Sequence, residues 1–155
     1  MKLILGLGNN SSEYKNTYHN VGFLMLDYLK TKNIDLPLIK LAGFMNEAGK
    51  DAAKALKKYK LTPEDMLVVH DDSDIPLGEY KFSSSRGSAG HKGVQNIIDV
   101  LGTNNFSRLR IGIRPTETID HIKAEDFVLK NISETNSEIL EKVFKTANET
   151  LLMML

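Results

Sequence analysis

The chain has 155 residues, of which 41% are hydrophobic and 26% charged, and its 20 basic residues balance its 20 acidic ones. This composition is typical of one globular domain and excludes a disordered or collagen-like chain. Its overall charge gives no reason to expect a nucleic-acid partner, DNA included, or a membrane partner. The absence of cysteine excludes disulfides, thiolate metal sites and cysteine nucleophiles, and the N-terminal apolar run is too short for a signal peptide, so we expect a cytoplasmic protein.

The first half of the chain alternates apolar runs with helical patterns. Residues 2–6 form an apolar run that ends in glycine, as a buried parallel strand does. Apolar residues recur at helical spacing over 21–29, and a second helical pattern extends over about 46–59. Pro63 follows this pattern and breaks it, and 66–70 is the next predicted strand.

The second half continues the alternation. Residues 80–82 predict a short strand, and the serine- and glycine-rich stretch 83–93 predicts a loop. Apolar residues over 94–101 predict a helix that Gly102 ends. Leucine and isoleucine alternate with arginine and glycine over 108–114, which predicts a half-buried strand.

The C-terminal part predicts an edge strand at 126–129 and a final helix. Thr135 and Glu138 have the spacing of a capping box, so we expect this helix to begin near Thr135. No internal repeat, low-complexity segment or linker divides the chain. We therefore expect a single α/β domain over residues 1–155, in which strands alternate with helices.

Charge is unevenly distributed along the chain. Residues 81–114 contain six basic residues and a single acid, a net charge of +5, whereas residues 115–155 contain eight acids and four lysines. A basic face of this kind commonly binds phosphate groups, but scattered, solvated surface charge explains the same count.

The polar residues that follow the first predicted strand are candidate site residues. Gly6 and Gly8 resemble the start of a dinucleotide-binding fingerprint, but Ser11 stands where that motif requires glycine. We expect the glycines to let the backbone turn sharply and present Asn9 at the end of the strand, where open α/β sheets bind ligands. His19 precedes the first helix and is expected near the same crevice, although a single histidine is more often structural than catalytic.

Ionisable residues cluster at 70–74, immediately after a predicted strand, and three interpretations remain open. His70, Asp71, Asp72 and Asp74 could bind a hard metal ion, although their spacing is not that of an EF-hand. They could form a charged turn. Alternatively, one aspartate orients the imidazole of His19, as a carboxylate does for a catalytic histidine.

The glycine-rich segment 87–93 leads into a predicted helix, so its backbone N–H groups could hold an anion. A flexible turn explains the segment equally well, and the pattern is not that of an ATP-binding loop. The sequence contains no Gly-x-Ser-x-Gly elbow and no Ser-x-x-Lys pair, so it offers no recognisable covalent nucleophile.

Six short motifs, in this order, resemble those of the bacterial peptidyl-tRNA hydrolases. They are Gly-Leu-Gly-Asn at 6–9, Thr-Tyr-His-Asn-Val-Gly-Phe at 17–23, Phe-Met-Asn at 44–46, His-Asp-Asp-Ser-Asp-Ile-Pro-Leu-Gly at 70–78, Ser-Ala-Gly-His-Lys-Gly at 88–93 and Arg-Leu-Arg-Ile-Gly-Ile at 108–113. Asp-Phe-Val-Leu at 126–129 and the final helix extend the resemblance over nearly the whole chain.

The resemblance implies a monomeric, metal-independent and cofactor-free esterase that separates a peptide from the 3′ end of tRNA. It also implies a three-layer fold with a mixed, mostly parallel central sheet flanked by helices. By position, His19 matches the general base and Asp71 the carboxylate that orients it. The positions matched to substrate binding are Asn9, Tyr14, Phe44, Asn46 and Lys92, and those matched to tRNA phosphate binding are Lys81 and Arg110.

The chain departs from the family pattern at several positions. Gly-Asn-Pro-Gly is replaced by Gly-Asn-Asn-Ser at 8–11, Tyr18 stands where arginine is common, and Lys92 stands where the family has an asparagine. The connection from His19 to Asn46 is also short, as if an edge strand or hairpin were missing. Two alternatives therefore stay open: a tRNA- or ribosome-associated binding protein that has lost its chemistry, and a metal-dependent hydrolase that uses the 70–74 cluster.

Overall fold

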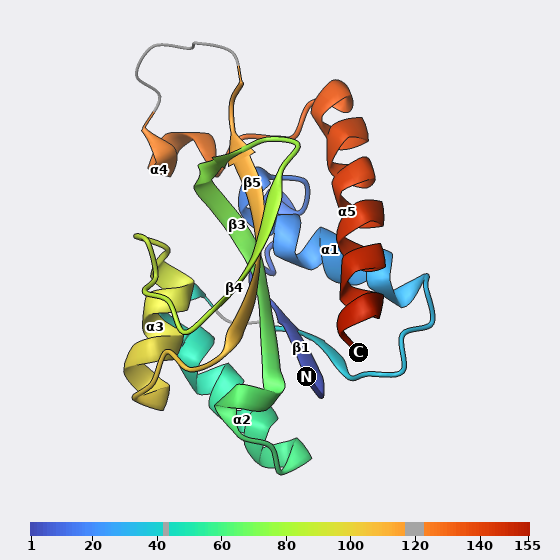
Figure 1. Cartoon of the computed structure of the whole chain (residues 1–155). Helices are drawn as coiled ribbons and strands as arrows, with labels where there is room; N and C mark the ends of the chain where they lie inside the picture. Colours follow the sequence, from blue (N-terminus) through green and yellow to red (C-terminus); the bar gives the residue numbers. More distant parts are fainter. Residues whose placement is uncertain (42–43, 117–122) are drawn as a thin grey trace.

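A computed structural model describes residues 1–41, 44–116 and 123–155. Its centre is a five-stranded sheet in the order β2-β1-β3-β5-β4 (Figure 1). The first four strands in this order are parallel, and β4 pairs antiparallel with β5. The strands are β1 (Leu3–Gly6), β2 (Leu38–Lys40), β3 (Met66–Pro76), β4 (Tyr80–Ser84) and β5 (Ser107–Arg114). The expected mixed, mostly parallel sheet is confirmed.

Helices cover both faces of the sheet and complete three layers (Figure 1). The helices are α1 (Val21–Lys30), α2 (Ala48–Tyr59), α3 (Lys92–Leu101), the single turn α4 (Ala124–Phe127) and α5 (Glu134–Met154). Helices α1 and α5 share one apolar core with one face of the sheet, and α2 and α3 share a second core with the other face. None of the helices in the described parts of the chain is both long enough and apolar enough to span a membrane.

The topology creates a crevice at the carboxyl end of strand β1. Strand β1 lies between β2 and β3. Helix α1 connects β1 to β2 across one face of the sheet, and helix α2 connects β2 to β3 across the other face. After β1 the chain passes to β2 on one side, and after β3 it passes to β4 and β5 on the other side, so β1 and β3 flank a topological switch point, where open α/β sheets bind ligands. Asn9 follows β1, and Asp71 lies in the part of β3 that extends beyond its pairing with β1, at this end of the sheet.

Helix α1 is seated unusually close to the sheet. A Cβ atom on Gly22 would lie 2.5 Å from the backbone oxygens of both Leu7 and Val69, so only glycine fits there. Gly8 is likewise in close contact, because a Cβ atom there would lie 2.7 Å from the ring of Phe23. The expected sharp turn at Gly6 and Gly8 is wrong, since neither has a positive φ; these glycines permit close packing instead.

The short connection from His19 to Asn46 contains one edge strand, β2, which pairs in parallel with β1. The structure corrects two other expectations. Residues 126–129 are not an edge strand: Asp126 and Phe127 lie in α4, and a turn follows. The final helix begins at Glu134, as expected near Thr135, but its N-cap is Ser133 rather than Thr135: the Ser133 hydroxyl accepts a hydrogen bond from the backbone N–H of Asn136.

Strand β5 is buried on both faces rather than one. It lies between β3 and β4, and both Arg108 and Arg110 are buried despite their charge. The alternation of leucine and arginine therefore reflects two different buried environments. The strand 66–70 likewise extends to Pro76, and β4 extends to Ser84 in the segment expected to be a loop. Helix α3 ends as expected, with Gly102 at φ 69°.

Candidate active site

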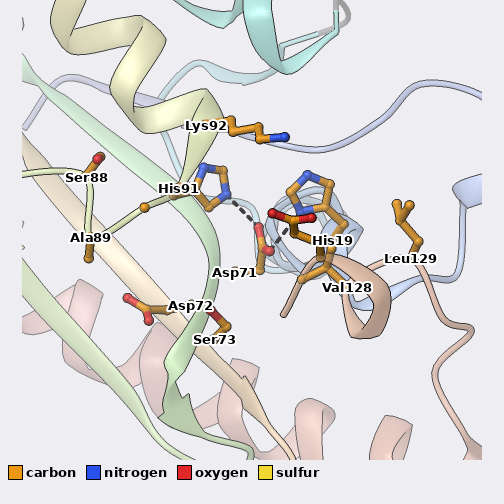
Figure 2. Close-up of a pocket in the computed structure, with 12 residues that line it drawn as sticks. His19, Asp71, Asp72, Ser73, Ser88, Ala89, His91, Lys92, Val128 and Leu129 are labelled. Atoms are coloured by element: carbon orange, nitrogen blue, oxygen red, sulfur yellow. Dashed lines mark hydrogen bonds and ion pairs between the residues drawn. The ribbon is translucent and has the colours of Figure 1, made fainter. Parts of the chain in front are cut away.

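A cavity of about 460 Å³ lies beside the second half of β3, between the start of α3 and the segment after α4 (Figure 2). Its lining combines His19, Asp71, Asp72, His91 and Lys92 with Ser73, the loop residues Ser88, Ala89 and Gly90, and a wall of Glu125, Val128 and Leu129. The structure therefore brings together His19 and Asp71, the two residues that the sequence pairs as base and carboxylate.

The segment just after α4 anchors the turn that carries His19. It lies in a short 3₁₀ turn, Tyr18–Asn20, that leads directly into α1. Its backbone N–H donates to the carbonyl of Val128 at 2.8 Å, and the Tyr18 ring stacks on Phe127 with 4.4 Å between centroids. The segment that was expected to be an edge strand thus anchors the turn that carries His19.

Asp71 accepts a hydrogen bond from the His19 ring. His19 Nδ1 lies 2.8 Å from Asp71 Oδ2, and the side chain of Asp71 is only 4% exposed. Burial alone would raise the pKa of Asp71, but the nearby imidazoles of His91 and His19 outweigh it, so its pKa lies well below the usual range. Asp71 is therefore an ionised carboxylate at neutral pH.

His91 is a second imidazole on the same carboxylate, and the sequence analysis did not identify it. Its Nε2 lies 2.8 Å from Asp71 Oδ1. His91 is also the N-cap of α3, where its Nδ1 accepts from the backbone N–H groups of Gly93 and Val94. Because Nδ1 accepts these bonds, the neutral ring carries its proton on Nε2 and donates it to Asp71. The available signal was a histidine immediately before an apolar helical pattern.

The protonation of His19 follows from these contacts. With Nδ1–H donated to ionised Asp71, neutral His19 keeps its lone pair on Nε2. Burial lowers the pKa of His19, but the hydrogen bond and the charge of Asp71 together overcome this effect, and the pKa lies above its usual value. The charge of Lys92 acts in the opposite direction and lowers the pKa of His19. Such a ring can take a proton from water.

His70, one residue before Asp71, has a different role. Its Nδ1 donates to the backbone carbonyl of Asp71 at 2.7 Å, and its Nε2 accepts from buried Arg108 at 3.3 Å. Burial, followed by the charges of His91 and Arg108, keeps the pKa of His70 well below its usual value. Arg108 also donates to the carbonyl of Gly87 at 2.7 Å, so this pair supports the loop beside the cavity.

The proposed metal-binding set at 70–74 does not come together. His70 faces Arg108, Asp72 pairs with Arg110, and the described residues with converging ligand atoms are instead His19, Asp71 and His91, within 4.8 Å of one another. Both imidazoles in that group already donate to the carboxylate. A metal ion there would have to replace both hydrogen bonds, so the geometry favours a hydrogen-bonded triad.

Arg110 and Lys81 lie side by side, but they differ in exposure. They are direct cross-strand partners on β5 and β4. Arg110 Nε donates to Asp72 Oδ2 at 2.8 Å, its Nη1 lies 3.2 Å from the hydroxyl of Ser83, and its side chain is 11% exposed. Lys81 is exposed. Only some of the basic residues of segment 81–114 are therefore exposed on the surface, because Arg108 and Arg110 are buried.

Asn9 lines a second cavity, of about 260 Å³, beside the turn that carries His19. Asn20 binds the backbone of Asn9 twice: its Oδ1 accepts from the N–H at 2.6 Å, and its Nδ2 donates to the carbonyl at 2.9 Å. The Asn9 side-chain oxygen accepts from the backbone N–H of Ser11. Asn20 is thus a further buried residue that positions the predicted site.

The remaining candidates are Lys92, Tyr14, Phe44 and Asn46. Lys92 lines the His19 cavity, whereas Tyr14, Phe44 and Asn46 do not. Phe44 is 70% exposed and Asn46 is exposed in the 3₁₀ turn Met45–Glu47. This turn packs beside the start of α3, because a Cβ atom on Gly93 would lie 2.7 Å from Met45 Sδ. Tyr14 is partly buried in the 3₁₀ turn Ser12–Tyr14.

Comparison with known proteins connects this geometry with one family. The family model described as peptidyl-tRNA hydrolase matches residues 3–155. The chain is 36% identical over 171 aligned positions to the peptidyl-tRNA hydrolase of Lactobacillus gasseri, covering 97% of this chain and 91% of that protein. It is 37% identical to the peptidyl-tRNA hydrolase of Aquifex aeolicus, with 98% and 88% covered.

A solved structure shares the fold. The crystal structure of peptidyl-tRNA hydrolase from Acinetobacter baumannii superimposes with a TM-score of 0.83 at 28% identity, covering 94% of this chain and 83% of that one. The sequence relationships extend over nearly the whole chain, and the shared architecture agrees with them. The chain belongs to the peptidyl-tRNA hydrolase family.

Proposed function

We propose that this protein hydrolyses the ester bond between a peptide and the 3′ end of tRNA. The observation that carries the proposal is the 2.8 Å hydrogen bond between His19 and ionised Asp71 at the wall of an open cavity, in a chain of this family. An ester is more labile than an amide, so an activated water suffices, and no covalent nucleophile is required.

The reaction follows from the tautomer of His19. Nε2 removes a proton from water as the water oxygen bonds to the ester carbonyl carbon, and the carbonyl π electrons move to the oxygen. When that C=O bond re-forms, the C–O bond to the ribose breaks and the leaving oxygen takes the proton from the imidazolium. The products are a peptide acid and tRNA with a free 3′ hydroxyl. Asp71 fixes the ring orientation and stabilises the imidazolium.

The substrate is held by residues in and beyond the His19 cavity. The amides of Asn9, which lines the neighbouring cavity, and of Asn46 can donate and accept hydrogen bonds, which suits a peptide backbone. Exposed Phe44 and partly buried Tyr14 supply aromatic surface, and Val128 and Leu129 give the cavity an apolar wall. Lys92 contributes a cation at the same cavity.

Recognition of tRNA uses phosphates rather than base sequence. Lys81 is exposed next to Arg110, so it supplies the accessible charge, while Arg110 is already paired with Asp72. Phosphate contacts of this kind accept many tRNAs. We further propose that the protein acts as a monomer in the cytoplasm, where its substrate arises from translation, and that it needs no cofactor or metal.

The test is hydrolysis of N-acetyl-aminoacyl-tRNA by the wild type and by His19→Ala, with a chelator present. We expect the wild type to turn over and the variant to lose activity while retaining tRNA binding and its melting temperature. Loss of wild-type turnover on chelation would instead identify a metal-dependent hydrolase. If the wild type binds tRNA without turnover and His19→Ala binds equally well, the protein is a binding protein of this fold.

A further inference from the structure

Lys92 occupies a position that is electrostatically unfavourable for helix stability. It is the first residue of α3, directly after the N-cap His91. The N-terminus of a helix carries partial positive charge, so a cation there is disfavoured and an anion favoured. Within the described chain, Lys92 forms none of the ion pairs that offset such a charge. This arrangement suits a residue whose partner is a bound anion.

The Lys92 side chain lies at the catalytic cavity. It lines the same cavity as His19, and Figure 2 shows it extending from α3 toward the His19 ring. The proximity has an electrostatic effect, since the charge of Lys92 opposes protonation of His19. Among the described residues, the other charged and titratable groups that line this cavity are Asp71 and Asp72 from β3, His91 from the turn before α3 and Glu125 from α4.

The three carboxylates that line the cavity, Asp71, Asp72 and Glu125, differ in the partners they already have. Asp71 already accepts from two imidazoles, and Asp72 accepts from Arg110, so both carboxylates are occupied. Glu125 belongs to the wall on the α4 side of the cavity. Lys92 has no carboxylate partner among residues 1–41, 44–116 and 123–155, and it lies beside the base that activates water. Its ammonium is therefore available for negative charge that appears during the reaction.

We infer that Lys92 stabilises the oxyanion that forms on the ester carbonyl oxygen when water attacks. The inference rests on the proposed hydrolysis. In that step the carbonyl π electrons move to the oxygen, the water proton moves to His19 Nε2, and the full negative charge exists only until the C=O bond re-forms. A fixed cation that meets charge present only near the transition state raises kcat rather than substrate affinity.

A role in binding tRNA phosphate predicts different kinetics. Phosphate charge is present in both the ground state and the transition state, so losing such a contact raises KM and weakens the salt dependence of binding. Loss of oxyanion stabilisation lowers kcat and leaves the salt dependence unchanged. The two roles are therefore separable in one set of measurements.

The experiment compares Lys92→Met, Lys92→Arg and Lys92→Asn with the wild type on N-acetyl-aminoacyl-tRNA, over a range of pH and salt. Lys50→Met is the matched control, because Lys50 is an exposed lysine in the first turn of α2 that lines none of the described cavities. His19→Ala gives the background rate. Melting temperatures show whether each variant folds.

We expect Lys92→Met to lower kcat by about tenfold to a hundredfold, less than the 10²–10³-fold typical of a buried donor, because Lys92 is exposed. Its KM and salt dependence should change little, and its activity profile should move to higher pH because the pKa of His19 rises. Lys92→Arg should retain most of the activity and Lys92→Asn should lose part of it. All three should melt at or above the wild-type temperature.

Three results would overturn the inference while leaving the proposed hydrolysis intact, provided that the wild type turns over and His19→Ala does not. They are an unchanged kcat in Lys92→Met, a rise in KM with a weaker salt dependence, and a higher kcat in Lys92→Asn than in the wild type. An equal loss in Lys50→Met would attribute the effect to overall charge. A wild type without turnover would remove the proposed function, and the inference with it.

Discussion

Two consecutive residues of β3, Asp71 and Asp72, use the same chemical group for different purposes. Side chains alternate across a strand, and Figure 2 shows the two carboxylates pointing away from each other. Asp71 accepts from the imidazoles of His19 and His91, whereas Asp72 accepts from the guanidinium of Arg110, each at 2.8 Å. The same hydrogen-bond length thus occurs with titratable imidazole partners on one side and with a permanently charged guanidinium on the other.

The difference arises from the partner rather than from the aspartate. An imidazole gains and loses a proton near neutral pH, so a carboxylate beside it controls a reaction. A guanidinium keeps its proton at any accessible pH, so the carboxylate beside it supplies only structure and charge balance. Changes that remove one carboxylate at a time should therefore separate effects on catalysis from effects on stability.

Asp71→Asn should have the largest effect on the reaction. His91 must donate from Nε2, because its Nδ1 accepts from the backbone of α3, so it holds the amide oxygen of the new side chain. The amide NH₂ then faces His19 and forces the lone pair of that ring onto Nδ1, which leaves Nε2 protonated. We expect kcat to fall by about 10³–10⁴-fold, as for loss of a tautomer-fixing aspartate. A single-turnover assay measures this; a fall of less than tenfold would refute the assigned tautomer.

Asp72→Asn should instead lower stability. It leaves the nearly buried charge of Arg110 without its counter-ion, which costs about 2–4 kcal/mol in the free energy of unfolding. Activity per folded molecule should stay within a few fold of the wild type. Urea unfolding gives the first quantity, and kinetics below the unfolding transition give the second. A loss of activity matching that of Asp71→Asn would mean that the two carboxylates are not separate in function.

Lys81→Ala and Arg110→Ala should separate the same two effects on the tRNA-binding side. Lys81 is exposed and can displace counterions from a tRNA phosphate. Its loss should therefore reduce the slope of log binding constant against log salt concentration by about 0.7–0.9. Arg110 is already balanced by Asp72, so its loss should reduce the slope less and the stability more. Filter binding at several salt concentrations decides this. Equal changes in slope would show that Arg110 leaves Asp72 to bind phosphate.

The smallest effect is a pH-dependent contribution of His19 to stability. Its folded-state pKa is raised, so protonated His19 favours the folded state; this contribution is complete below the usual histidine pKa and is lost as the pH rises through the folded pKa. The pKa of Asp71 is lowered, so its contribution is lost only in strong acid. The wild type should therefore exceed His19→Ala in unfolding free energy by more at pH 6 than at pH 8. Urea titrations at both values test the sign.

The sequence predicted the main strands and helices because their apolar patterns match their burial. It missed β2, whose three residues are only partly buried and follow a proline. It also treated Arg108 and Arg110 as signs of an exposed face, because burial of an arginine depends on partners far along the chain, such as His70 and Asp72.

For the site, local pattern and family resemblance together indicated His19 and Asp71, and the structure places these two in contact. They did not indicate His91, because its contact with Asp71 depends on how α3 meets β3, which no local pattern specifies. Asn9 lines a different cavity for a local reason: its side-chain oxygen accepts a hydrogen bond from the backbone N–H of Ser11, two residues along the chain.

The close seating of α1 has a consequence for interpreting variants. Gly22 lies three residues after His19, where its Cα faces the carbonyl oxygens of β3 and of the loop after β1. Even the single methyl group of Gly22→Ala would push this end of α1 outward and carry the imidazole away from its carboxylate. Such a molecule could retain every reactive group and its overall fold yet lose activity. Loss of turnover alone therefore does not show that the altered residue meets the substrate.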